Sequence, residues 1–193
     1  MCGRTSETAD EAELQSYLDN LRVSWQLSRG YRRRWNIAPS AGLTTIIEDA
    51  SGRVARSMRW GWYRSWSDRL LSNAKSETVA TSKTFGAAFR SSRGVVVVDT
   101  YYEWRRNPAG PKTPFRIHTH GGELFLMAAL WESGSPLNDG VESCTILTAA
   151  ATDEMRAIHN RVPVILERDA ALEWINPDTN PDTLRTIIAN CVS

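Results

Sequence analysis

Hydrophobic and polar positions near the start of the chain follow a helical period. A capping-box sequence, Thr8-Ala-Asp-Glu11, precedes apolar side chains spaced three or four residues apart from Leu14 to Trp25. Side chains at this spacing share one face of a helix, and a capping box marks a helix start. The pattern therefore predicts an amphipathic helix that ends near Gly30.

Apolar runs of strand length, bounded by Gly, Pro, Asn and Asp, fill the middle of the chain. Because strand follows strand with short connections, we expect mostly antiparallel pairing. A polar run at 73–77 lacks a clear period and predicts a turn or a surface loop. The predicted strands are residues 43–47, 54–60, 95–104, 115–118, 124–131 and 143–148, with a turn at 49–52 between the first two.

The remaining pattern predicts short helices at 152–158, 169–174 and 181–189. No repeat, low-complexity tract or long linker interrupts the sequence. We therefore expect an α+β fold in a single compact domain spanning residues 1–193. Its curved, mostly antiparallel sheet should be barrel-like and carry peripheral α-helices.

Composition is that of an ordinary globular chain, with 193 residues, 41% hydrophobic and 23% charged. No apolar run of about 18 residues predicts a membrane helix, and no secretory signal is apparent. We expect a cytoplasmic protein, associated with the nucleoid if it is bacterial. Its cysteines, at positions 2, 144 and 191, lack disulfide or zinc spacing, so we expect reduced thiols and no metal.

Charge is unevenly distributed along the chain. Residues 1–106 hold 17 of the 23 Lys and Arg but 11 of the 22 Asp and Glu, which gives this part a net charge of +6. Trp60, Trp62 and Trp66 lie in one stretch with Arg59 and Arg64. Rings interleaved with cations suit stacking on exposed bases, although core packing is the commoner role of a single tryptophan.

The second residue, Cys2, is the most informative candidate for chemistry. If Met1 is removed, Cys2 carries both an α-amine, with a pKa of about 7.7–8.0, and a thiol, with a pKa of about 8.5. The amine of such an aminothiol condenses with an aldehyde, and the thiol then closes a thiazolidine ring. The natural partner of this chemistry is an aldehyde, although Cys at position 2 also occurs by chance.

Two further polar side chains have alternative interpretations. Glu103 ends an apolar strand, and its carboxylate either faces solvent or points inward, where a raised pKa would suit it to acid/base work. His159 lies in a loop before Arg161 and Pro163. It is either a structural histidine or an acid or phosphate-facing group.

The ordered set of motifs resembles the SRAP family, the SOS response-associated peptidase domains that capture abasic sites in single-stranded DNA covalently. The motifs run from residue 2 to beyond residue 166, which is nearly the whole chain. They are Cys2-Gly-Arg4, Trp35-Asn-Ile-Ala-Pro39, Met58-Arg-Trp-Gly61, Asn73-Ala-Lys-Ser-Glu-Thr78, Phe89-Arg90, Tyr102-Glu-Trp104, Leu130-Trp-Glu132, Thr145-Ile-Leu-Thr148 and Ile158-His-Asn-Arg-Val-Pro163.

The resemblance implies catalytic roles for four residues. Cys2 would be the nucleophile that forms an imine and then a thiazolidine, and Asn73 would position its amine and the sugar. Glu103 and His159 would transfer protons during ring opening, imine formation and reversal. The implied DNA contacts are Arg4, Pro39, Trp60, Lys75, Thr148 and Arg161.

The resemblance further implies that the partner is single-stranded DNA containing abasic sites. We also expect a monomer without cofactor or metal. The resemblance also implies autoproteolytic removal of Met1. The chain departs from the family pattern at Lys75, where Arg is usual, at Asn160, where Asp is usual, and at Val162, where Met is usual. These departures concern the DNA channel and the surroundings of the histidine.

Two alternatives to abasic-site capture remain open. In the first, Cys2 is the nucleophile of an N-terminal-cysteine peptidase or amidohydrolase. In the second, the chain is a non-catalytic single-stranded DNA-binding module that uses its basic, Trp-rich first part. A peptidase would cleave peptides or amides, and a plain binding module would not distinguish lesioned from intact DNA.

Overall fold

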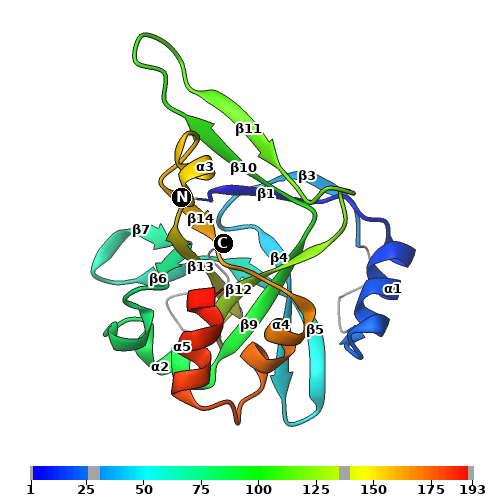
Figure 1. The fold of residues 1–193 in the computed structure, drawn as a ribbon. Coiled ribbons are helices and arrows are strands. Elements are labelled where there is room, and N and C mark those ends of the chain that lie inside the picture. Colours follow the sequence, from blue (N-terminus) through cyan, green and yellow to red (C-terminus); the bar gives the residue numbers. More distant parts are fainter. Residues whose placement is uncertain (1, 26–30, 135–139, 191–193) are drawn as a thin grey trace.

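The computed structural model describes residues 2–25, 31–134 and 140–190 (Figure 1). Helices lie on the periphery of a strongly curved sheet, and one long hairpin projects from it. The helices are α1 (Glu11–Asn20), α2 (Gly86–Ser91), α3 (Asp153–Arg156), α4 (Arg168–Ile175) and α5 (Pro181–Asn190), with a 3-10 turn at Val79–Thr81.

A four-stranded antiparallel sheet contains the start of the chain. Its order is β11-β10-β1-β3, and β1 is therefore an inner strand. The four strands are β11 (Thr113–Ile117), β10 (Thr100–Arg105), β1 (Arg4–Glu7) and β3 (Arg34–Ile37).

The larger sheet in the described part of the chain has the order β14-β13-β12-β9-β4-β5-β2, with β15 paired to β12 and β8 paired to β13. A separate hairpin joins β6 (Trp62–Arg64) to β7 (Ser67–Leu71). The strands of the larger sheet are β2 (Ser24–Trp25), β4 (Gly42–Asp49), β5 (Gly52–Trp60), β8 (Asn73–Lys75), β9 (Arg93–Val98), β12 (Phe125–Glu132), β13 (Ser143–Ala150), β14 (Arg161–Pro163) and β15 (Ile165–Leu166).

One parallel pairing closes the larger sheet into a barrel. Strand β13 pairs with β12 and also with β5, where Cys144 lies opposite Trp60. The path β13-β12-β9-β4-β5 therefore returns to its starting strand. Closure leaves these strands without an open edge, and it confirms the predicted barrel-like, mostly antiparallel α+β fold.

Alternate residues of the barrel strands belong to two separate apolar clusters. On β9, Val96 and Val98 join the cluster that contains Cys2, whereas Val95 and Val97 join the other. Successive side chains of a strand point to opposite faces, so one cluster fills the barrel and the other covers its outside. Burial on both faces explains why these strands are continuous apolar runs in the sequence.

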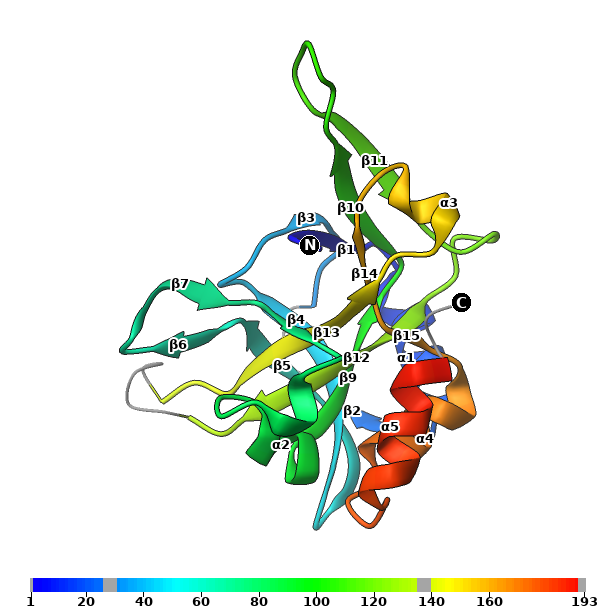
Figure 2. The ribbon, with the colours of Figure 1, turned by 60° about the vertical axis from the view of Figure 1, so that its left-hand side comes forward.

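Four helices cover the outside of the barrel (Figures 1 and 2). Each contributes buried side chains to the outer cluster, whereas α3 lies near the four-stranded sheet and buries none. The helical side chains in the outer cluster are Leu14 and Leu18 of α1, Phe89 of α2, Ala171, Trp174 and Ile175 of α4, and Leu184 and Ile188 of α5.

The predicted strands at 43–47, 54–60, 115–118, 124–131 and 143–148 and the three C-terminal helices are confirmed within a few residues. The first helix is also present, but its predicted ends are wrong. The capping box is formed by Asp10 and Glu13, and the helix ends at Asn20. Arg22 then has a φ of 56°, which breaks the helix, and Trp25 lies in β2. Gly30 lies outside the described residues.

Two other expectations are corrected. The predicted strand at 95–104 is two strands that belong to different sheets, because the chain leaves the barrel at Asp99. The predicted loop at 73–77 begins with β8, whose Asn73 lies opposite Ile146 of β13. This strand was missed because it is short and takes its order from pairing rather than from an apolar pattern.

The turn after β5 depends on glycine. Gly61 has a φ of +110°, and a Cβ there would collide with Cγ of Leu70 on β7. We expect Gly61→Ala to lower the free energy of unfolding by about 1–3 kcal/mol from backbone strain, with the collision added. Urea unfolding measures the loss.

Gly52→Ala is the matched control. Gly52 has a φ of +103°, but a Cβ at this position would meet nothing within 4 Å beyond the adjacent residues. The variant therefore carries the backbone strain without the collision, and it should lose less stability than Gly61→Ala. Equal losses in the two variants would contradict the close contact between Gly61 and β7.

Candidate active site

The position of Cys2 follows from the anchoring of β1. Backbone pairing with β10 and β3 holds β1 on both sides. Buried side chains add to this, because Thr5 Oγ1 donates to the Thr100 carbonyl at 2.6 Å and Ser6 Oγ donates to Asp99 Oδ1 at 2.5 Å. Chain termini usually fray, but here the second residue has a defined place at one end of the barrel.

The Cys2 side chain is fully buried in the barrel cluster. Its Sγ lies 3.7 Å from the Arg4 carbonyl oxygen, to which the thiol donates. Burial, followed by the negative charge of Glu103, raises the pKa of the Cys2 thiol to about 12. In this arrangement the group is a neutral thiol near neutral pH.

Asn73 holds the backbone of Cys2. Strand β8 runs parallel to β13, and this pairing places Asn73 beside the amino terminus. Its Nδ2 donates to the Cys2 carbonyl at 3.0 Å and to Ser72 Oγ at 3.1 Å. Within the described residues, its buried Oδ1 has no hydrogen-bond partner. An acceptor in this state suits a donor that arrives with a substrate or with a new amine.

Glu103 points inward from β10. It is only 2% exposed, although its strand neighbours Tyr102 and Trp104 are partly exposed. Of the two interpretations of this carboxylate, the structure therefore supports the inward one. The negative charge of Glu103 is the second cause, after burial, that raises the pKa of the Cys2 thiol.

His159 lies on the other side of Glu103. Its Nδ1 is 3.9 Å from Glu103 Oε1 and accepts the backbone N–H of Arg161 at 3.0 Å. The same Nδ1 also lies 3.2 Å from the Arg161 carbonyl oxygen, to which it donates in the other tautomer of the ring. Hydrogen bonding links Asn73 to Cys2, the charge of Glu103 acts on the Cys2 thiol, and Glu103 lies 3.9 Å from His159, so the four predicted catalytic residues interact with one another.

Two of the predicted phosphate-binding residues face each other across β8 and β13. Lys75 lies opposite Thr148 in the register of these strands. Lys75 is exposed, whereas Thr148 is fully buried and its Oγ1 donates to the Ala74 carbonyl at 3.5 Å. Lys75 thus presents a cation to solvent, and the Thr148 hydroxyl lies inside the protein.

Arg161 is held by a carboxylate that sequence reasoning missed. It forms a bidentate pair with Glu77, with Nη1 at 2.5 Å from Oε1 and Nη2 at 2.9 Å from Oε2. Nη2 also donates to the carbonyl and the hydroxyl of Thr148. The guanidinium is therefore largely engaged within the protein. The available signal was the position of Glu77 in the same polar run as Asn73 and Lys75.

Arg4 and Pro39 lie nearer the surface. Nη1 of Arg4 donates to Asn36 Oδ1 at 2.9 Å, and the side chain is partly exposed. Pro39 follows β3 and is half-buried. Both residues are open to contact with a ligand.

Of the clustered tryptophans, only the last presents its ring to solvent. Trp60 and Trp62 are buried, and Trp60 Nε1 donates to the Ser72 carbonyl at 2.8 Å. Trp66, in the turn between β6 and β7, is 67% exposed. Trp60 thus has the core position that is commoner for a tryptophan, and the exposed ring is that of Trp66.

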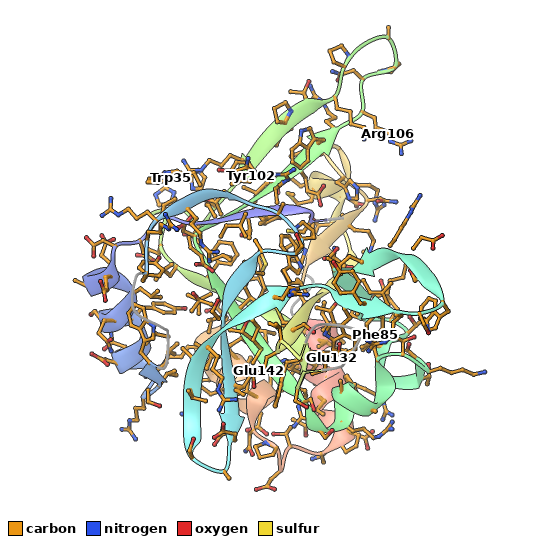
Figure 3. All side chains as sticks on the ribbon, turned by 180° about the vertical axis from the view of Figure 1, so that it is seen from behind. Trp35, Phe85, Tyr102, Arg106, Glu132 and Glu142 are labelled. Atoms are coloured by element: carbon orange, nitrogen blue, oxygen red, sulfur yellow. The ribbon has the colours of Figure 1, made fainter. Side chains whose placement is uncertain are left out.

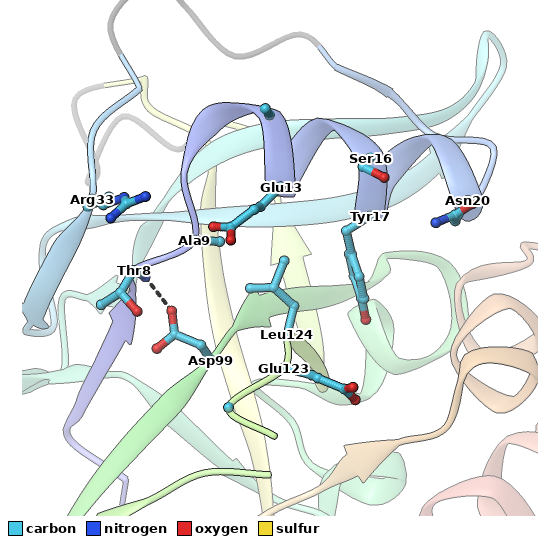
Figure 4. A pocket seen from close by; sticks show the side chains of 12 residues that line it. Thr8, Ala9, Glu13, Ser16, Tyr17, Asn20, Arg33, Asp99, Glu123 and Leu124 are labelled. Atoms are coloured by element: carbon cyan, nitrogen blue, oxygen red, sulfur yellow. Dashed lines mark hydrogen bonds between the residues drawn. The ribbon is translucent and has the colours of Figure 1, made fainter. Parts of the chain in front are cut away.

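A cavity of about 850 Å³ lies away from these residues (Figure 4). It is bordered by α1 and by the segment that leads into β12, and Tyr17, Asp99 and Leu124 are among its lining residues. None of the predicted site residues lines it. We therefore place the candidate site at Cys2, where the chemically capable groups converge.

The described residues contain no group of three or more His, Cys, Asp and Glu side chains arranged to hold a metal ion. Cys2 and Cys144 are both free thiols. No helix in the described ranges has the length and apolar character needed to cross a membrane.

Fold and site together define a barrel protein that carries a buried cysteine at its second residue, next to a carboxylate and an imidazole. The family model described as SOS response associated peptidase (SRAP) matches residues 1–193. The chain therefore belongs to the SRAP family.

Similar proteins have related names. The chain is 33% identical to the abasic site processing protein YoqW of Bacillus subtilis (strain 168), over 97% of this chain and 86% of that protein. It is 31% identical to the abasic site processing protein YedK of Escherichia coli (strain K12), over 100% of this chain and 87% of that protein. HMCES of Gallus gallus, also named an abasic site processing protein, is 27% identical over 91% of this chain and 66% of that protein.

Solved structures share the fold. A phage-related protein from Bordetella bronchiseptica superposes with a TM-score of 0.79 at 26% identity, covering 98% of this chain and 88% of that one. A protein from Bacteroides thetaiotaomicron gives a TM-score of 0.80 at 17% identity, over 97% and 86% of the two chains. The barrel with its N-terminal strand is thus a shared architecture.

The pair between Glu77 and Arg161 should make stability depend on pH. Hydrogen bonds from Arg161 are the main cause that lowers the pKa of Glu77 below 4.5. A lowered carboxylate pKa stabilises the fold above the unfolded pKa, and this contribution is lost as the pH falls through the folded value. At neutral pH, Glu77→Gln should cost under about 1 kcal/mol, since the carboxylate is nearly half exposed.

The difference between wild type and Glu77→Gln, measured by urea unfolding, should shrink as the pH is taken well below 4.5. Asp182→Asn is a control, because it breaks the more exposed pair between Asp182 and Arg185 on α5. A gap between wild type and Glu77→Gln that stays constant down to acid pH would show that the ionised pair contributes nothing.

Proposed function

We propose that this protein captures abasic sites in single-stranded DNA covalently, through Cys2 after removal of Met1. The observation that carries the proposal is the convergence of the Asn73 amide and the pair of Glu103 and His159 on Cys2. Membership of the SRAP family supports it, as do the names of the relatives as abasic site processing proteins. The proposed crosslink shields the lesion during repair associated with replication.

The proposed reaction uses both groups of the N-terminal cysteine. The α-amine attacks C1′ of the ring-opened sugar, and loss of water gives an imine. The Cys2 sulfur then adds to the imine carbon, and its proton passes to the nitrogen as the five-membered thiazolidine closes. No oxidant or cofactor enters this sequence, because every bond formed is balanced by water or by proton transfer.

Removal of Met1 also prepares the thiol. The positive chain terminus is among the groups that lower the pKa of Cys2, although burial outweighs it. Removal of Met1 moves this charge onto Cys2 itself, and charges interact more strongly at shorter distance.

Proton transfer falls to Glu103 and His159 in this proposal. The abasic sugar is mostly a closed hemiacetal, and opening it requires a proton to leave the C1′ hydroxyl and another to reach the ring oxygen. Glu103 is buried next to the sulfur, and His159 lies 3.9 Å beyond it with a more exposed ring. A buried carboxyl and an imidazole can relay these protons between substrate and solvent.

Asn73 positions the amine. Its Nδ2 already fixes the Cys2 carbonyl, and its Oδ1 is a buried acceptor without a partner in the described residues. The α-amine lies on the same residue as that carbonyl, so the unoccupied Oδ1 can accept one of its N–H groups. This bond would orient the nitrogen lone pair towards C1′.

Several surface groups are proposed to bind the DNA strand. Lys75 supplies a solvent-facing cation for a phosphate, and the half-buried Pro39 and the exposed ring of Trp66 supply surfaces for neighbouring bases. A site without a base in single-stranded DNA also costs no unpairing energy.

The first experiment mixes untagged protein, shown by mass spectrometry to lack Met1, with a single-stranded oligonucleotide that contains one abasic site. A denaturing gel should show a stable shifted band that requires the lesion. Cys2→Ala should abolish the stable band, because the imine formed by its amine cannot close a ring. Borohydride added during the reaction should trap that imine and restore a band.

A second variant separates the amine from the thiol. Inserting Gly between Met1 and Cys2 keeps the thiol but moves the terminal amine to another residue, so no thiazolidine can form. A stable band from this variant, or its absence from the wild type, would overturn the proposed chemistry. Binding that ignores the lesion would favour a plain DNA-binding module.

Glu103→Gln tests the proton-transfer role. General acid–base groups contribute about 10²–10⁴ to a rate, so we expect crosslinking to slow by about 100-fold or more. Glu132→Gln is the matched control, since Glu132 is paired with Arg64 outside the Cys2 site. Single-turnover gel kinetics measure both rates. Equal rates in the two variants would remove Glu103 from the mechanism.

A further inference from the structure

The four-stranded sheet has one face that the barrel does not cover. In the register of its strands, Arg4 of β1 lies opposite Tyr102 of β10, which lies opposite Arg116 of β11. Two residues along β10, Trp104 lies opposite Pro114. Cross-strand partners share a face, so these side chains form one surface.

Burial distinguishes the two faces of this sheet. On the inner face, Tyr101 and Glu103 are almost fully buried. On the other face, Tyr102 and Trp104 are partly exposed and Arg116 is exposed. The alternation along β10 therefore separates the catalytic carboxylate from an open surface on the opposite side of the same strand.

This open surface extends to the edge strand β3 in one direction and beyond the end of β10 in the other (Figure 3). At the β3 edge, Trp35 is 61% exposed, and its carbonyl accepts the Tyr102 hydroxyl at 3.2 Å. At the other end, Arg106 is exposed where β10 enters the projecting hairpin. Trp35, Tyr102 and Arg106 lie along the same upper part of the molecule in Figure 3.

The charge of this region has one sign. The four strands contain two carboxylates, Glu7 and Glu103, and both are buried. Residues 104–122, which form the hairpin and its extension, contain no Asp or Glu. Their cations are Arg105, Arg106, Lys112 and Arg116.

We propose that this outer sheet face is a second contact surface for single-stranded DNA, which binds the lesion-free part of the strand flanking the site at Cys2. Exposed rings interleaved with arginines match the two features of an unpaired strand, its unstacked bases and its phosphates. A duplex would offer the phosphates but not the base faces. The residues of the outer sheet face are Arg4, Trp35, Tyr102, Trp104, Arg106 and Arg116.

The inference deepens the proposed function, because it assigns the strand beyond the lesion to a defined surface. Its test nevertheless needs no lesion. Affinity for a lesion-free oligothymidylate of about 15 nucleotides, near the upper site size of single-strand binding folds, can be measured by fluorescence anisotropy at several salt concentrations.

Three variants address this surface. Arg106→Glu combined with Arg116→Glu should weaken binding at least about tenfold and flatten the salt slope by about 1.4, which corresponds to two lost phosphate contacts. Trp35→Ala should weaken binding about fivefold or more without changing the slope, as expected for one stacked base. Arg106→Glu alone serves if the double variant fails to fold, since Arg106 makes no hydrogen bond among the described residues.

Lys83→Glu is the matched charge control. Lys83 is exposed and precedes α2, which lies at the opposite end of the molecule from the hairpin in Figures 1 and 2. Its reversal changes the net charge as Arg106→Glu does, but it should leave the affinity nearly unchanged. Equal losses for the two single reversals would show a general charge effect and overturn the proposal.

Crosslinking of an abasic oligonucleotide of about 5 nucleotides, near the lower site size, distinguishes this proposal from the proposed function. In one outcome, the wild type crosslinks the short abasic oligonucleotide, but the outer-face variants bind the long strand normally. The outer sheet face is then not a DNA contact, and the proposed function stands. In the opposite outcome, no crosslink forms but the variants lose affinity for the long strand. The outer sheet face then binds DNA, and the proposed abasic-site capture is wrong. Recognition of unpaired bases would be overturned if the variants lost as much affinity for a duplex as for the single strand. It would also be overturned if Trp35→Ala lost no affinity for the single strand.

Discussion

The anchoring of β1 as an inner strand is the constraint on which the site depends. The proposed role of Cys2 as nucleophile requires a chain end with a fixed position, and chain ends are ordinarily the least ordered part of a domain. Here both Asp99 oxygens are engaged, one by Ser6 Oγ and the other by the backbone N–H of Thr8. Glu7 accepts from Arg34 and from the Thr44 N–H, which ties β1 to β3 and to the barrel strand β4. Polar side chains, fully paired, thus fix an element that has few apolar residues of its own.

Barrel closure sets the environment into which this strand delivers Cys2. The pairing of β13 with β5 encloses an apolar interior, and Cys2 belongs to that interior cluster together with Trp60. The low polarity that keeps the thiol protonated also strengthens every charge placed near it. Burial is the main cause that raises the pKa of the Cys2 thiol, and the charge of Glu103 adds to it. Strand β13 also pairs with β8. This pairing brings Asn73 within hydrogen-bond distance of Cys2, although the two residues are far apart in the sequence.

Much of the fold could be predicted from local pattern, and most of the site could not. The barrel strands are apolar runs because both of their faces are buried, as with 95–98 and 124–131. Strands β1 and β8 lack such apolar runs, because backbone pairing and polar side-chain contacts hold them in place. Their sequences therefore show no alternation that would predict a strand. The sequence left the orientation of Glu103 open, because a strand end can present a residue to either side. Glu77 could not be identified as the partner of Arg161, since the two are 84 positions apart.

The ion pairs of the structure determine which of the basic residues in the first part of the sequence keep an unpaired positive charge. Several arginines of the basic first part are neutralised locally, such as Arg34 by Glu7 and Arg56 by Asp49 and Glu142. Net charge alone therefore overstates the positive surface that a ligand meets. The cations of the β10–β11 hairpin lie in a segment without Asp or Glu, whereas Arg161 is paired with Glu77. Under the proposed function, a DNA phosphate replaces the Glu77 carboxylate as the bidentate partner of Arg161, because the two anions offer similar geometry. In the free protein, Glu77 holds the Arg161 side chain, and the Arg161 backbone N–H donates to His159.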